Sequence, residues 1–104
     1  MSNENEILVR EIIKLINELQ VIVTDLDNLE LSLLDKLNIG DETAHKVLKS
    51  RLNDARPKII EIGKRLNTLG GMEVMQIALE KINERDKSHT VISTYWNGIG
   101  EWLF

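Results

Sequence analysis

The chain has 104 residues, of which 42% are hydrophobic and 29% charged, and its formal net charge at pH 7 is −4. These values predict one globular domain with one hydrophobic core, and they exclude a chain that is disordered throughout. The absence of cysteine excludes disulfides, thiolate metal sites and a catalytic thiol, and it suits a cytoplasmic protein. The acidic N-terminus and the lack of a long apolar run predict neither a signal peptide nor a membrane segment.

Residues 6–37 predict a long first helix with one apolar face. Its apolar residues follow the alternating spacing of a heptad repeat, namely Leu8, Ile12, Leu15, Leu19, Ile22, Leu26, Leu29 and Leu33. With Ile12 taken as position a, Val9, Ile16 and Val23 fall at position e and widen this face enough to pack against more than one neighbour. In the segment 38–41 that follows, Gly40 can end a helix and Asp41 can cap the next one, so we expect the chain to reverse there.

Residues 42–69 predict a second helix with the same apolar spacing, antiparallel to the first in a helical hairpin. Residues 1–42 carry ten acids and three bases, whereas residues 43–69 carry two acids and seven bases. Acidic g positions of the first helix then oppose basic g positions of the second, and such pairs specify register in coiled coils. The predicted register pairs are Glu11 with Arg65, Glu18 with Lys58, and Asp25 with Arg51.

Two shorter helices are predicted after the hairpin. Pro57 lies inside the second helix and predicts a kink there, because the apolar spacing continues through it without a change of phase. Gly70 and Gly71 predict the end of that helix. Apolar spacing then predicts a third helix over 72–86, and Ser88 is a plausible cap for a fourth over 89–96. The fold class is therefore all-α, with residues 1–104 in a single helical domain.

The third helix is too short to cover the whole apolar face of the first. We expect it to cover Val9 and Ile16 but not the bundle or dimer face near the turn, formed by Val23, Leu31, Leu34 and Leu37. That face must be covered either by the C-terminal segment 88–104 or by a second copy of the chain. Further apolar residues of the first helix, Ile7, Ile13 and Val21, lie outside its apolar face. This is more exposed apolar surface than a small monomer usually has, so we expect a homodimer that completes the bundle.

The C-terminal segment 95–104 contains every aromatic residue of the chain, namely Tyr95, Trp96, Trp102 and Phe104. One interpretation is that this tail folds back and fills the uncovered end of the bundle. The other is that these aromatics bind a groove of a partner protein, as interface hot spots do. Both interpretations remain open from the sequence.

Two patterns suggest other functions. Glu42 with His45, and Asp86 with His89, have the spacing at which a carboxylate and an imidazole share a metal in di-iron bundles, and they would belong to a metal-dependent helical enzyme. Both pairs fall at predicted helix ends, where Glu42 favours the helix dipole, so we expect no metal, no cofactor and no catalytic residues. The basic second helix would suit a nucleic-acid-associated regulator. Because acidic residues oppose it, we expect nucleic acid not to be a partner.

Trp96-Asn97-Gly98 forms a W-x-G motif. With this motif, its length and its predicted helical hairpin, the chain resembles the WXG100 family. The resemblance implies a secreted helical-hairpin dimer. In that family the motif lies in the turn between the two helices, whereas this chain is predicted to turn at 38–41. We therefore predict a non-enzymatic protein-interaction module, such as a scaffold, adaptor or regulator. Its expected partners are a second copy of itself and an unidentified protein, and no membrane is involved.

Overall fold

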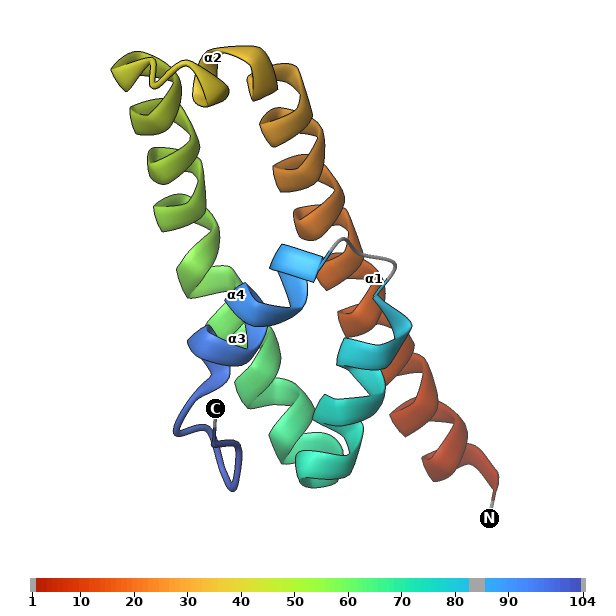
Figure 1. The fold of residues 1–104 in the computed structure, drawn as a ribbon. Helices are drawn as coiled ribbons and strands as arrows, with labels where there is room; N and C mark the ends of the chain where they lie inside the picture. The colour runs from red at the N-terminus through yellow and green to blue at the C-terminus, as the bar shows by residue number, and fades with distance from the viewer. Residues whose placement is uncertain (1, 83–85, 104) are drawn as a thin grey trace.

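The computed structural model describes the backbone of residues 2–82 and 86–103, with side chains described for 4–82 and 91–103. Its elements are the helices α1 (Ser2–Ser32), α2 (Leu34–Asn38), α3 (Glu42–Lys81) and α4 (Asp86–Trp96), shown in Figure 1. The described residues contain no strand, which confirms the predicted all-α class. The radius of gyration is 15.4 Å, against roughly 13 Å for a compact domain of this length, so the molecule is elongated.

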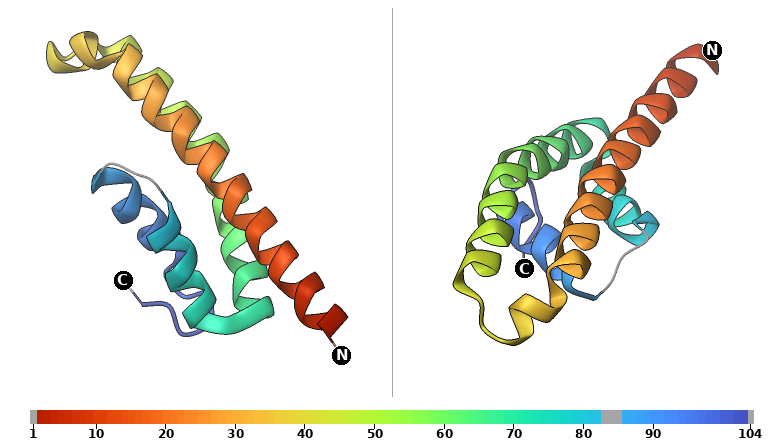
Figure 2. Two further views of the ribbon diagram at one scale, coloured as in Figure 1. Left: turned by 90° about the vertical axis from the view of Figure 1, so that its right-hand side faces the viewer. Right: turned by 90° about the horizontal axis from the view of Figure 1, so that it is seen from above.

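The N-terminal part of α3 runs antiparallel to α1, and the short α2 joins them at one end of the molecule (Figures 1 and 2). The helix predicted over 6–37 is interrupted at Leu33, whose φ of −103° and ψ of 1° are not helical. The Ser32 hydroxyl donates to the Leu29 carbonyl at 2.8 Å, and the Leu33 amide shares itself between the carbonyls of Leu29 and Glu30. A serine that bonds back to its own helix in this way favours a bend.

After α2 the chain enters α3 through a capped turn. Gly40 has a φ of +77°, which a residue with a side chain rarely adopts. The Asp41 carboxylate then accepts a hydrogen bond from the amide of Ala44 at 3.0 Å and so caps the first turn of α3.

The direction of α3 changes at Gly71, which has a φ of +71° and a ψ of −161°. Residues 72–81 then lead back beside α1 (Figure 1). This break lies where Gly70 and Gly71 predicted the end of the second helix, and helical residues continue on both sides of it, through Pro57 before it and as far as Lys81 after it. Residues 83–85, where the predicted third helix would continue, lie outside the described residues, and α4 begins at Asp86 rather than at residue 89.

The hydrophobic core lies in the half of the molecule away from α2. Helices α1, α3 and α4 all contribute buried side chains to it. These are Leu15, Leu19 and Val23 from α1; Ile59, Ile62, Leu66, Met75 and Ala78 from α3; and Ile92 and Trp96 from α4, with Ile82 and Trp102 beside them. The antiparallel helices therefore pack tightly at one end, and α4 closes the core between them (Figure 1).

The packing of α4 depends on a glycine in the middle of α3. The indole of Trp96 is fully buried, and its Nε1 donates to the carbonyl of Ile59 at 2.9 Å. A Cβ atom built on Gly63 would overlap the indole at Nε1 and would lie 2.6 Å from Cδ1 and 2.9 Å from Cε2. Glycine at position 63 is thus what allows the ring to lie against the backbone of α3.

Candidate interaction surfaces

The structure packs the predicted aromatic tail into the core of the chain itself. Trp96 is 0% and Trp102 6% exposed, and their rings meet edge to face with centroids 5.2 Å apart. Trp102 Nε1 donates to the carbonyl of Ser93 at 3.2 Å. Tyr95 is half-buried, with the Arg56 guanidinium 5.3 Å from its ring centroid. Phe104 lies outside the described residues.

The burial of Trp96 and Trp102 bears on both interpretations of the tail. The two tryptophans are inaccessible to a partner in this conformation, so the docking interpretation would require the tail to detach. The tail does not lie at the turn near residue 38. Gly100 lies close to the side chain of Asn67 in the central part of α3, so close that a Cβ atom on Gly100 would overlap it. The W-x-G motif falls at the end of α4, where Gly98 has a φ of +90°.

The predicted dimer face near the turn is only partly exposed. Val23 is 2% exposed, and it lines a pocket together with Val91 and Ile92 of α4. Val23 is therefore covered by residues of the C-terminal segment 88–104, which was one of the two coverings expected from the sequence. Leu31 and Leu34 are 44% and 43% exposed, and Leu37 is half-buried.

The coverage expected near the N-terminus of α1 also differs. Val9 is 52% exposed, so residues 72–81 do not cover it as predicted. Ile16 is partly buried and packs against the core.

The predicted register pairs lie along the contact between α1 and α3. Arg65 and Glu11 form an ion pair of 3.1 Å between Nη2 and Oε1. Glu18 and Lys58 line one surface hollow. Asp25 and Arg51 line another, nearer to the turn. These charges lie at the solvent edge of the helix contact, where an ion pair contributes about 0–1 kcal/mol.

The outer face of α1 exposes several aliphatic side chains. Ile7 is 66%, Ile13 51% and Val21 61% exposed. Ile13 and Val21 line one shallow hollow with four polar neighbours, namely Arg10, Lys14, Asn17 and Glu18. Residues four apart lie on one side of a helix, so Ile13, Asn17 and Val21 form a single stripe.

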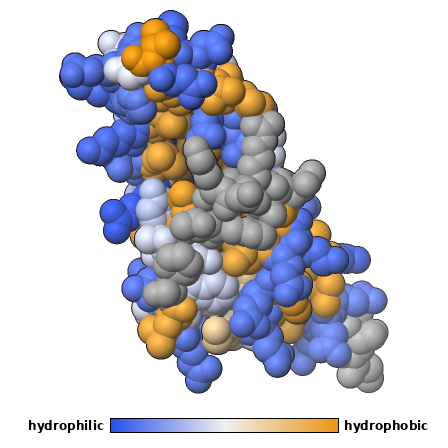
Figure 3. All heavy atoms as spheres, viewed as in Figure 1, coloured by the Kyte–Doolittle hydropathy of each residue, from blue (hydrophilic) through white to orange (hydrophobic). Residues whose placement is uncertain are grey.

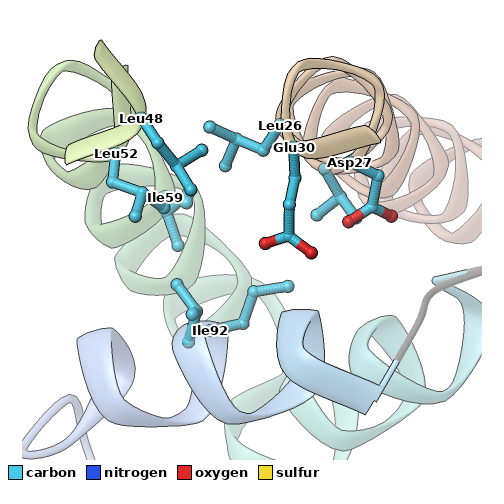
Figure 4. Close-up of a pocket in the computed structure, with 9 residues that line it drawn as sticks. Leu26, Asp27, Glu30, Leu48, Leu52, Ile59 and Ile92 are labelled. Atoms are coloured by element: carbon cyan, nitrogen blue, oxygen red, sulfur yellow. The ribbon is translucent and has the colours of Figure 1, made fainter. Parts of the chain in front are cut away.

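A pocket of about 180 Å³ lies between α1, α3 and α4, next to the closed part of the core. Its described walls are mostly aliphatic, and they comprise Val23, Leu26, Leu48, Leu52, Ile59, Val91 and Ile92 together with Asp27 and Glu30. Figure 3 shows hydrophobic residues between the upper parts of α1 and α3. In Figure 4 the carboxylate of Glu30 points into the space between the helices, with that of Asp27 beside it.

The heptad pattern contains a signal for this pocket. Glu30 follows Val9, Ile16 and Val23 in the e series, so a carboxylate stands where an aliphatic residue would continue the apolar face. An antiparallel hairpin that turns at 38–41 would bring Leu26 against Leu48 in a closed layer, yet both are half-buried and line the pocket. The separation of the helices could not be read from the periodicity.

Metal ligands do not gather in the described part of the chain, where no group of three or more histidine, aspartate or glutamate side chains is placed to hold an ion. His45 is exposed at the start of α3, and the side chain of His89 lies outside those described. Among the described residues, no helix has the length and apolar character needed to cross a membrane.

Comparisons of the chain with protein-family models, with curated proteins and with solved structures find no match.

Proposed function

We propose that this chain is a non-enzymatic helical protein-interaction module that self-associates through the outer face of α1. The carrying observation is the exposure of Ile13 and Val21, two aliphatic side chains on one stripe of a long helix. Burying such side chains against a second protein removes them from water, at roughly 25 cal/mol per Å² of apolar surface. The chain's lack of cysteine is consistent with a cytoplasmic setting.

The stripe is complementary to itself. Ile13 and Val21 lie four residues before and four residues after Asn17. When a second copy is laid antiparallel across the stripe, Ile13 of each copy meets Val21 of the other, and the two Asn17 side chains meet at the two-fold axis. Such an isologous contact closes on itself and produces a dimer rather than a filament.

The charges beside the stripe support the same orientation. Lys14 and Glu18 lie on the same flank of α1 and line the same hollow. In the antiparallel dimer Lys14 of each copy lies near Glu18 of the other, so opposite charges oppose each other twice. These pairs favour the antiparallel orientation.

Sedimentation equilibrium across a range of protein concentrations tests the proposal. The expected result is a concentration-dependent mass that rises toward twice the 11.9 kDa of the chain. Val21→Lys should reduce it to the monomer mass, whereas Val47→Lys, the same substitution at a 42% exposed position of α3, should leave it unchanged. A mass that stays at 11.9 kDa at all concentrations contradicts the proposed dimer.

Charge reversal tests the orientation. Lys14→Glu alone or Glu18→Lys alone places like charges opposite each other and should weaken the dimer, while the double variant should restore it. A double variant that dimerises no more strongly than either single variant would show that these residues do not oppose each other.

Binding of DNA or RNA with steep salt dependence would instead favour the alternative of a nucleic-acid-associated regulator.

A further inference from the structure

The pocket between α1, α3 and α4 lies where the closed hydrophobic core ends. Toward the core, Leu19 of α1 and Ile59 of α3 are both 0% exposed, and Ile59 also lines the pocket. Toward the turn, Leu26 and Leu52 are only half-buried and form two of its walls. In Figure 4 the side chains of Leu26, Leu52 and Ile92 converge on one space from three helices. The space is therefore enclosed by elements that are far apart in the sequence.

The pocket has the size and the walls of an apolar ligand site. Its volume of about 180 Å³ slightly exceeds that of apolar protein cavities that bind benzene, at about 150 Å³. Seven of its nine described lining residues are aliphatic. Side chains that border empty space lose dispersion contacts, and a molecule that fills the space restores them. One aromatic ring with a methyl group matches this volume.

The polar lining residues do not require a charged ligand. Asp27 and Glu30 are the polar residues among the described walls, and both belong to α1. Both already interact with other groups of the chain. The described side chains that α3 and α4 contribute are aliphatic and cannot hold a water molecule, which needs about two to four polar partners in a buried site. An uncharged apolar molecule is thus favoured over water on this side of the pocket.

From the volume and the aliphatic walls we infer that the pocket binds one uncharged apolar molecule of about the size of a methyl-substituted benzene ring. The ring lies between Leu26, Leu52 and Ile92 and completes the layer that the two long helices leave unfilled. Because it touches α1, α3 and α4 together, a ligand that binds only the folded chain also stabilises the docking of α4.

The test uses the full chain and two probes of nearly the same shape, toluene and phenol, in which a methyl group and a hydroxyl group replace each other. Each probe is titrated while the backbone amide signals of the protein are followed by NMR. We expect toluene to bind about tenfold more tightly than phenol, because the hydroxyl loses its hydrogen bonds to water on entering aliphatic surroundings. The largest shifts should fall at Val23, Leu52 and Ile92.

A larger side chain at position 52 tests the place of binding. Leu52→Trp puts the indole into the pocket and should weaken toluene binding by at least about tenfold. Leu69→Trp, the same substitution at another half-buried position of α3 that does not line the pocket, should leave the affinity unchanged. Far-UV circular dichroism shows whether each variant keeps its helices.

A smaller side chain at position 26 gives a second test that does not depend on Leu52→Trp folding. Leu26→Ala enlarges the pocket, so the affinity for naphthalene relative to toluene should rise by at least about fivefold, since the second ring then buries more apolar surface. Leu8→Ala, a control at a 36% exposed position of the same helix, should leave this ratio unchanged.

Several results would overturn the inference. Equal affinities for toluene and phenol would show that the site does not select an apolar ligand. Equal effects of Leu52→Trp and Leu69→Trp, or an unchanged ratio in Leu26→Ala, would place the ligand elsewhere, as would shifts confined to Ile13 and Val21. Failure of toluene to bind up to its solubility would show that the pocket is not a site for this class of ligand. These outcomes are separate from the proposed dimer, which uses the outer face of α1.

Discussion

Replacing Gly63 with alanine should destabilise the protein, although alanine is the better helix former. At an unhindered position inside a helix, this substitution would raise the free energy of unfolding by about 1 kcal/mol. Here the new Cβ would overlap the indole of Trp96, which is 0% exposed and has no free space to enter. Displacing the ring also breaks its hydrogen bond to the Ile59 carbonyl, which costs about 1 kcal/mol.

The net effect follows from these opposing contributions. Removing a buried tryptophan side chain altogether costs about 3–5 kcal/mol. A ring that is displaced but retained loses part of that, so we expect Gly63→Ala to lower the free energy of unfolding by about 2–4 kcal/mol after the gain in helix propensity. This is a large fraction of the about 5–15 kcal/mol that stabilises an ordinary domain.

Urea unfolding followed by far-UV circular dichroism measures this change. The sharper test repeats the substitution in the Trp96→Ala background, where the obstacle is gone and alanine at 63 should stabilise by about 1 kcal/mol. Ser50→Ala, on the exposed side of α3, is the control and should change stability by less than about 0.5 kcal/mol. The reasoning fails if Gly63→Ala stabilises the unmodified chain, or if its effect has the same sign in both backgrounds.

Three further experiments test the turns and the ion pair, each by the same unfolding assay. Asp41→Ala removes the cap of the Ala44 amide and should cost about 1 kcal/mol; no loss would mean that the cap is dispensable. Gly71→Ala forces a side chain into a backbone conformation that is nearly exclusive to glycine and should cost about 1–3 kcal/mol; a neutral result would show that the bend can relax. A double-mutant cycle on Glu11 and Arg65, whose side chains are 32% and 57% exposed, should give a coupling below about 1 kcal/mol that vanishes near 1 M salt; a larger, salt-insensitive coupling would contradict the exposed placement of the pair.

Local patterns along the sequence were sufficient to predict the helical class and several features of the chain path. The 4-3 spacing of apolar residues, the glycine and aspartate at positions 40 and 41, and the glycines at 70 and 71 each act within a few residues, and the structure has its turns at these places. The ion pair of Glu11 with Arg65 follows the same regularity, because two heptads in antiparallel register bring equivalent positions together.

The pocket between α1, α3 and α4 could be predicted only in part. Glu30 interrupts an otherwise aliphatic e series, and this is visible in the sequence. That it lines a cavity is not visible, because the same pattern is equally compatible with a closed seam in which Leu26 and Leu48 touch.

The sequence by itself therefore determined which segments are helical, where they are capped and which faces are apolar, since these depend on neighbours a few residues away. Only the tertiary structure decided which face each helix covers. Trp96 is held by Ile59 across 37 residues of sequence, and its fit depends on the missing side chain at Gly63, a complementarity of shape that periodicity does not encode. That contact places α4 over Val23 and leaves the pocket open beside it, because a single short helix cannot fill the whole space between two long ones.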